Sequence, residues 1–318
     1  MKKPKIGLVL GSGAARGWAH IGVIHDLADL GIQPDLVTGS SVGAVVGGAY
    51  ASGNLEAFEE WISSLGRVDI IRLLDAKMTG GGFLQGNSLM KAIEERIGSP
   101  MIENLRIPFA CVATELATGR EVWMREGPLL DACRASIALP GMFAPARNEL
   151  EDFLVDGGLV NPVPVSVARA MGADVVIAVN LNGDRIGRHF FVHAHDPETS
   201  EEDSERQLLE YEMHDSAVAK WAARMKAGFG VRLDSYISSL RKKESPEPGL
   251  FDVIAGSVDI VQDRITRSRM AGEPPDVHIT PRLSHIGLMD FDLSAECIRE
   301  GRAATHRRKS DLEALMTN

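Results

Sequence analysis

The chain has 318 residues, and its 44 acidic and 34 basic side chains give a formal net charge of −10. This length allows one large α/β domain or two ordinary domains. The hydrophobic fraction of 44% and the charged fraction of 25% are those of a folded globular protein and exclude wholesale disorder. An isoelectric point near 5.4 argues against a general nucleic-acid binder, which needs a basic face.

The cysteines and the apolar runs indicate the compartment. Cys111, Cys133 and Cys297 are odd in number and far apart, which argues against a disulfide framework or a C-x-x-C zinc site. They are typical of a reducing compartment. The apolar run at 6–10 is shorter than the roughly 7–15 residues of a secretory signal, and no run reaches the roughly 18 residues that span a bilayer. We therefore expect a cytoplasmic protein.

Short apolar runs alternate with glycine turns and helical patterns along the chain. This strand–turn–helix order is typical of a mainly parallel sheet covered by helices. We expect strands at 6–10, 36–38, 109–114, 153–155, 175–180 and 277–280, and helices at 19–30, 44–51, 129–136 and 164–171.

A change of composition marks an insertion at 183–250. Within it, residues 196–212 contain eight acids and one base. The insertion is either a solvated surface element or a lid that faces a membrane. We expect the catalytic domain to comprise 1–182 and 251–290, followed by a C-terminal helical tail at 291–318.

The sequence Gly39-Ser40-Ser41-Val42-Gly43 follows an expected strand and precedes an apolar helix. This is G-x-S-x-G in strand–turn–helix context, where small residues allow a sharp turn that exposes the central serine. The following helix directs its N-terminal N–H groups toward any anion near Ser41. Ser41 is therefore the candidate nucleophile.

A second glycine-rich loop, 11–17, follows the first strand. Its backbone N–H groups could form an oxyanion hole for acyl transfer. Alternatively, the loop could bind a dinucleotide, but Arg16 stands at the last position of G-x-G-x-x-G. A dinucleotide site also needs an acid at the end of the second strand, whereas Asp35 precedes that strand.

Asp156, followed by Gly157 and Gly158, stands at the end of an expected strand. Beside a serine turn it is a candidate base or orienting group. Histidine is the usual base of serine hydrolases, and His278 and His285 come late enough to complete a Ser–Asp–His order. No local pattern marks either histidine.

Together, the segments 11–17, 39–43 and 156–158 resemble the patatin-like phospholipase family, in particular its bacterial members related to the neuropathy target esterase catalytic domain. Segments 113–119 and 134–143 are also similar to that family. The resemblance covers about residues 4–182 and, more weakly, 251–290. It implies an α/β protein, with a three-layer α/β/α fold and a mainly parallel central sheet.

The resemblance also implies a Ser–Asp dyad without a catalytic histidine. Ser41 would be the nucleophile, and Asp156 would be the base. The oxyanion would be held by main-chain N–H groups of Gly11, Ser12, Gly13 and Ala14, with supporting roles for Arg16, Gly39, Gly43, Gly157 and Gly158. Ser12 replaces the middle one of three glycines usual in the family. Since backbone groups form the hole, we expect this difference to be mild.

The substrate class implied by the resemblance is an acyl lipid, either a phospholipid or a lysophospholipid. The chemistry requires no cofactor and no metal, and we expect no nucleic-acid partner. Peripheral contact with the inner face of the membrane stays open, and the oligomeric state is not indicated. Two rival functions are an NAD(P)-binding oxidoreductase and a catalytically silent regulatory protein of the same fold.

Overall fold

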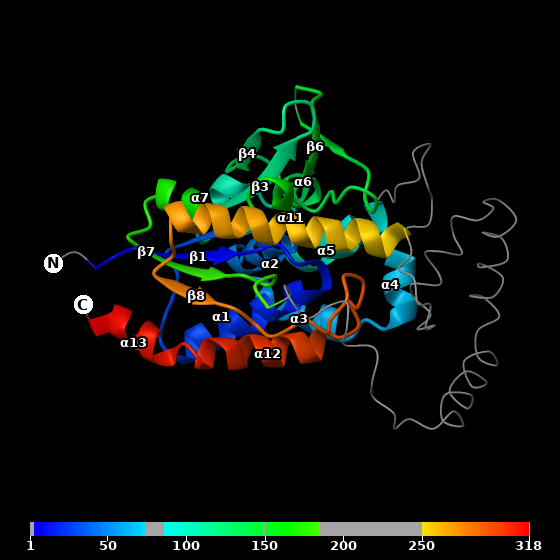
Figure 1. Cartoon of the computed structure of the whole chain (residues 1–318). Helices are drawn as coiled ribbons and strands as arrows, with labels where there is room; N and C mark the ends of the chain where they lie inside the picture. Colours follow the sequence, from blue (N-terminus) through cyan, green and yellow to red (C-terminus); the bar gives the residue numbers. More distant parts are fainter. Residues whose placement is uncertain (1–2, 74–85, 149, 185–249, 318) are drawn as a thin grey trace, which may run out of the picture. The chain divides into compact units, whose positions relative to one another are not determined.

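The structure is a computed structural model that describes residues 3–73, 86–148, 150–184 and 250–317 (Figure 1). Residues 1–186 and 258–318 belong to one compact unit, which includes the part of helix α11 from Val258 onward. The insertion expected at 183–250 lies outside the described residues except at its two ends.

Among the described residues, eight strands form one sheet in the order β5-β6-β3-β2-β1-β7-β8, with β4 also paired to β3. Strands β1, β2, β3, β7 and β8 run parallel, whereas β4 and β6 run antiparallel to β3, and β5 runs antiparallel to β6. The strands are β1 (Ile6–Leu10), β2 (Leu36–Ser40), β3 (Phe109–Glu115), β4 (Glu121–Met124), β5 (Ala146–Arg147), β6 (Phe153–Asp156), β7 (Val175–Val179) and β8 (Val277–Ile279).

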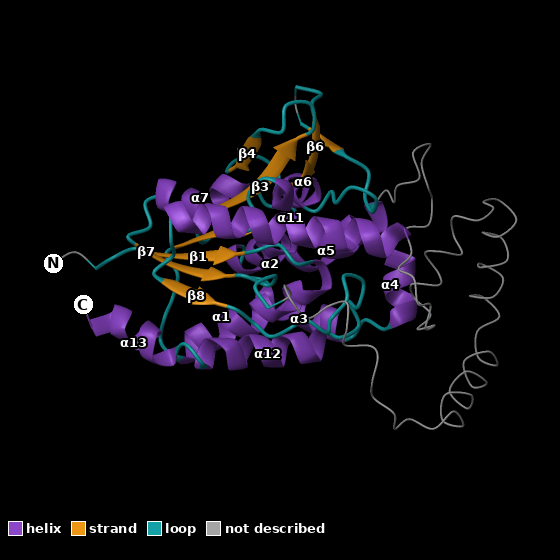
Figure 2. Cartoon of the chain, in the orientation of Figure 1, coloured by secondary structure: helices purple, strands orange, loops and turns teal. Residues whose placement is uncertain are grey.

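Helices surround the sheet (Figure 2). The α-helices are α1 (Ala19–Asp29), α2 (Val42–Ala51), α3 (Leu55–Ser63), α4 (Arg67–Leu73), α5 (Asn87–Ile97), α6 (Leu129–Ser136), α7 (Val165–Ala170), α11 (Leu250–Gly272), α12 (Ser294–His306) and α13 (Lys309–Thr317). Short 3₁₀ helices are η1 (Ala14–Trp18), η2 (Ile102–Asn104) and η3 (Gly157–Leu159).

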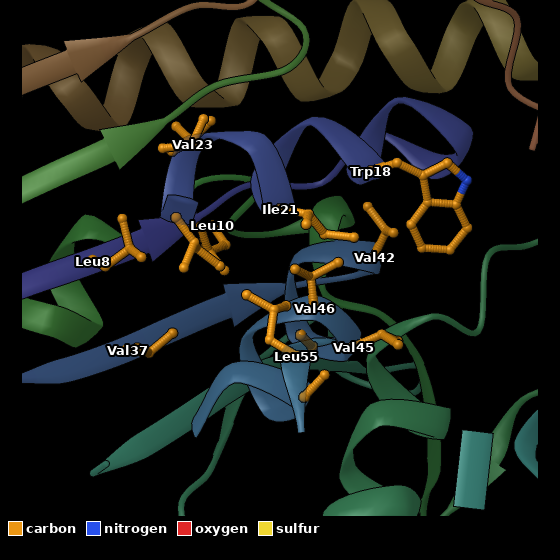
Figure 3. Close-up of a cluster of buried hydrophobic side chains, with 14 of the residues drawn as sticks. Leu8, Leu10, Trp18, Ile21, Val23, Val37, Val42, Val45, Val46 and Leu55 are labelled. Carbon is orange, nitrogen blue, oxygen red and sulfur yellow. The ribbon is translucent and has the colours of Figure 1, made fainter. Parts of the chain in front are cut away.

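The central strands are buried on both faces, as their continuous apolar sequences require. Leu8 and Leu10 of β1 pack with side chains of α1 and α2 (Figure 3). Val9, between them, points to the opposite face, where it packs with Val165 of α7 and Met270 of α11. This alternation confirms the expected three-layer α/β/α fold with a mainly parallel sheet.

Most of the expected elements are present, with small differences at their ends. The strand at 6–10 and the helix at 129–136 have the expected bounds. The second strand continues to Ser40, so that only Ser41 separates it from α2. The sequence analysis did not identify helices α3 to α5 or α11, or the short strands β4 and β5.

The expected C-terminal helical tail is helical, and its first helix is part of the compact unit. Helix α12 packs along α1 (Figure 1). The two helices approach so closely that a Cβ on Gly22 would overlap the carbonyl oxygen of Ile298, and a Cβ on Gly301 would overlap that of Ala19. Glycine is therefore required on both sides of this contact.

Strands β2 and β6 share one edge of β3. Ser40, the last residue of β2, pairs with Val112, and Asp156, the last residue of β6, pairs with Ala113. Strand β4 pairs along Cys111–Thr114 and therefore occupies the other edge. Because β2 and β6 run in opposite directions, their carboxyl ends meet at adjacent residues of β3.

We predict that Gly301→Ala lowers the free energy of unfolding by at least about 2 kcal/mol, because the new methyl group overlaps the backbone of α1. Urea titration measures the effect. Gly272→Ala is the matched control, since nothing lies within 4 Å of a Cβ at this position of α11. Equal stability of the Gly301→Ala variant and the parent would contradict this packing.

Candidate active site

Ser41 occupies a strained turn between β2 and α2. Its backbone angles are φ 55° and ψ −127°, a conformation that costs a non-glycine residue about 1–3 kcal/mol. The turn depends on the glycines on either side. A Cβ on Gly43 would overlap the carbonyl oxygen of Leu10, and a Cβ on Gly39 would lie 2.5 Å from the carbonyl oxygen of Gly43. Both supporting glycines therefore stand where the turn requires them.

Ser136 holds the strained turn from the neighbouring helix α6. The Ser41 backbone N–H donates to Ser136 Oγ at 2.9 Å, and that hydroxyl donates to the Val112 carbonyl oxygen at 2.7 Å. Ser136 thus links the turn to β3. Its role carried no sequence signal, because it lies in an ordinary helix 95 residues away from Ser41.

The structure brings Ser41 and Asp156 together. Ser41 Oγ donates a hydrogen bond to Asp156 Oδ2 at 2.6 Å, and the Gly158 N–H donates to Asp156 Oδ1 at 2.7 Å. Asp156 is fully buried. Burial raises the pKa of its carboxyl to about 6, and the hydrogen bonds from Ser41 and Gly158 oppose this shift only in part. A carboxylate with such a pKa is a usable base near neutral pH.

The loop 11–14 lies next to Ser41, but its four N–H groups are not equivalent. The Gly11 N–H donates to the Val179 carbonyl and the Ser12 N–H to the Pro162 carbonyl. Within the described residues, the N–H groups of Gly13 and Ala14 donate to no protein acceptor. The positive φ of the loop, 48°, falls on Ala14 and not on Ser12. Serine therefore fits position 12 without backbone strain.

Two buried side chains support this loop. Arg16 Nε donates to the Gly13 carbonyl at 3.0 Å, and Arg16 Nη2 pairs with Asp259 at 3.1 Å. His20 Nε2 donates to the Gly11 carbonyl at 2.8 Å. Burial lowers the pKa of His20 to about 4, so that its ring is neutral near pH 7. Arg16, fully buried, therefore fixes the loop.

Residues 258–272 of α11 bury several polar side chains. Asp259, Gln262 and Thr266 are buried, although they are polar. Ile260 and Val261 are about half exposed, at 50% and 47%. The helix turns its polar face toward the site: Ser12 Oγ bonds Gln262 Oε1 at 2.8 Å. The buried face of a helix in a soluble protein is usually apolar, so these buried polar groups indicate a particular role for this face.

A small cavity separates Ser41 from α11. Its volume is about 20 Å³, enough for about one water molecule. Its lining includes the loop, the serine turn and α11: Gly13, Ala14, Arg16, Ser41, Leu139, Val258, Asp259, Gln262 and Leu288. Four of the residues expected at the site, Gly13, Ala14, Arg16 and Ser41, thus line one cavity.

The two histidines considered for a triad make other contacts. His285 pairs with Glu296 at 2.6 Å, and His278 belongs to β8, beside Ala178 of β7. Neither is among the hydrogen-bond partners of Ser41 or Asp156 in the described ranges. Those ranges also contain no group of three or more His, Cys, Asp or Glu side chains arranged to hold a metal ion.

Comparison with known proteins identifies the family. The Patatin-like phospholipase family model matches residues 8–169. The chain is 35% identical to the NTE family protein Rv1063c of Mycobacterium tuberculosis, over 94% of this chain and 90% of that protein. It is 39% identical to Lysophospholipase NTE1 of Mycosarcoma maydis and 34% identical to human Patatin-like phospholipase domain-containing protein 6. Each of these matches covers 55% of this chain, and 10% and 13% of those proteins, respectively.

The fold and the matches define the class of protein as a lipid acyl hydrolase. The chain belongs to the patatin-like phospholipase family, as its sequence motifs predict. No helix in the described part of the chain combines the length and the apolar composition needed to cross a bilayer.

We predict that Asp156→Asn raises the melting temperature at pH 8. In the folded chain Asp156 keeps its proton up to about pH 6, whereas the unfolded chain loses it near pH 4. The parent therefore loses stability as the pH rises from about 4 to 6, and the neutral amide does not. Calorimetry at pH 4 to 8 measures this effect, with the exposed carboxyl of Asp131 in an Asp131→Asn control. A stabilisation by Asp156→Asn that does not change with pH would contradict it.

Proposed function

We propose that the chain is a serine esterase that hydrolyses the acyl ester bonds of phospholipids or lysophospholipids through a Ser41–Asp156 dyad. The observation that carries the proposal is the 2.6 Å hydrogen bond from Ser41 Oγ to a buried carboxylate. The printed name of the Mycosarcoma maydis relative, a lysophospholipase, supports the substrate class.

The reaction has two steps. Asp156 takes the proton of Ser41 as Oγ attacks the ester carbonyl carbon, and Asp156 returns that proton to the departing alcohol. An acyl-Ser41 intermediate results. Asp156 then takes a proton from a water molecule, whose oxygen attacks the acyl carbon, and the fatty acid leaves as Ser41 regains its proton. No cofactor or metal takes part in these steps.

Gly13 and Ala14 are the proposed donors to the oxyanion. The sequence analysis assigned this role to four N–H groups, but those of Gly11 and Ser12 already donate to carbonyl groups of the fold. The carbonyl groups that accept from Gly11 and Ser12, together with Arg16 and His20, keep the loop in place. A donor that is already oriented needs no reorganisation during the reaction, which is the source of its catalytic effect.

Ser41 is partly buried and borders a small cavity. A cavity of about 20 Å³ holds a water molecule and not an acyl chain. The exposed Ile260 and Val261 lie on the same helix, with an apolar character that suits a lipid surface. A peripheral membrane contact through this part of α11 would bring the site to its substrate.

The two rival functions make different demands. A dinucleotide-binding oxidoreductase needs an acidic side chain after the second strand, where this chain has the Ser41 turn. A silent regulatory protein needs no reactive serine. Labelling of Ser41 by a fluorophosphonate probe separates the hydrolase from both, because only an activated and accessible serine reacts.

We predict that Ser41→Ala and Asp156→Ala reduce esterase activity by at least about 10³-fold, because each removes one half of the dyad. His278→Ala and His285→Ala should keep most of the activity. Hydrolysis of a short-chain ester, together with fluorophosphonate labelling, measures both effects. Collapse of the activity in a folded histidine variant would rule out the dyad.

We predict that kcat/KM rises with pH and levels off above a midpoint of about 6. Below this pH Asp156 is protonated and cannot accept the Ser41 proton. A pH series from 4.5 to 8.5 with a soluble ester measures the profile, and His278→Ala serves as the control with the same midpoint. A midpoint that disappears in His278→Ala would identify a histidine as the base.

A further inference from the structure

In the described residues, the carboxamide oxygen of Gln262 is hydrogen-bonded, whereas its nitrogen has no protein acceptor. Its Oε1 accepts hydrogen bonds from Ser12 Oγ at 2.8 Å and from Asn182 Nδ2 at 3.0 Å. These two hydrogen bonds place the oxygen of Gln262 toward Ser12 and Asn182 and its nitrogen on the other side. Within the part of the chain that the structure describes, Nε2 donates to no protein acceptor.

The carboxamide nitrogen of Gln262 lies near the carboxyl group of Asp156. Gln262 lines the cavity beside Ser41. A Cβ built on Gly158 would overlap Gln262 Nε2 and would lie 2.9 Å from Asp156 Oδ1, so the two atoms flank the same point. Gln262 is 5% exposed. Because Gln262 lines this cavity, a ligand atom in the cavity can accept a hydrogen bond from its Nε2.

We propose that Gln262 is a catalytic residue of this site, whose Nε2 donates a hydrogen bond to the oxygen that departs from the acyl carbon and then to the water oxygen that attacks it. The inference rests on the proposed dyad. Both oxygens exchange a proton with Asp156, so both occupy the position beside its carboxyl group. A donor there stabilises the departing oxygen and orients the water molecule.

Ser12 is the positioning residue for this group. The family usually has glycine at this position, and in this chain the hydroxyl holds the Gln262 oxygen instead. The pair connects the loop that carries the proposed oxyanion donors to helix α11. It also gives a role to polar side chains that α11 buries.

The decisive experiment follows p-nitrophenyl butyrate hydrolysis by stopped flow in the 318-residue chain. The p-nitrophenolate group leaves without a donor, so loss of Gln262 Nε2 should slow deacylation and spare acylation. We expect Gln262→Met to show a burst close to one equivalent and a steady rate about 10- to 100-fold lower. Thr266→Val, one helical turn along the same buried face, is the matched control and should leave both phases unchanged.

Two further variants separate catalysis from packing. Gln262→Glu keeps the oxygen that accepts from Ser12 and Asn182 but loses the donor. It should show the same burst, with a pH midpoint shifted upward by the second carboxyl beside Asp156. Ser12→Gly should slow deacylation several-fold, because the carboxamide is no longer oriented.

Each outcome has one meaning. A folded Gln262→Met variant with parental deacylation overturns the inference, and so does an equal loss in acylation and deacylation, which indicates packing alone. Parental protein that neither reacts with a fluorophosphonate nor turns over the ester overturns the dyad together with the inference. A reactive parent with an unaffected Gln262→Met variant overturns the inference only.

Discussion

The shared edge of β3 is the constraint on which the site depends. Strand β2 occupies this edge as far as Val112, and β6 occupies it from Ala113 onward in the opposite direction. The carboxyl ends of the two strands meet there. Strand β2 leads directly into the serine turn, and β6 ends at Asp156. In a parallel sheet, functional groups normally gather at the carboxyl ends of the strands. Here an antiparallel strand supplies Asp156, the proposed base, from the other direction.

This arrangement brings two energetically unfavourable features together. Ser41 has a strained backbone, and Asp156 is a buried carboxyl group. Such features persist only where the surroundings over-determine them. Ser136 holds the backbone of Ser41, Gly158 supplies an N–H to Asp156, and Thr114 donates to the Asp156 carbonyl. These hydrogen bonds hold the strained turn and the buried carboxyl group in place.

The sequence predicted what local patterns can encode. Glycines two residues either side of Ser41 indicate the turn, and the alternation of apolar runs predicts the three layers. The sequence could not predict which distant segments meet, because Ser136 and Gln262 carry no local signal. Helix α11 escaped identification for a physical reason: polar side chains lie on its buried face, and apolar and charged side chains are mixed on its exposed face, so the usual helical pattern is weak. Of the four N–H groups expected to hold the oxyanion, those of Gly11 and Ser12 already donate to carbonyl groups. Only the fold reveals these hydrogen bonds.

The buried charge of Arg16 has a consequence for where this protein can be divided. The family model ends at residue 169, yet the carboxylate that pairs with Arg16 is at position 259. A chain cut at 169 would keep the serine, the aspartate and the glycine loop but leave a guanidinium in the interior without its counter-ion. The catalytic unit is therefore larger than the region that defines the family, and its two halves are not exchangeable modules.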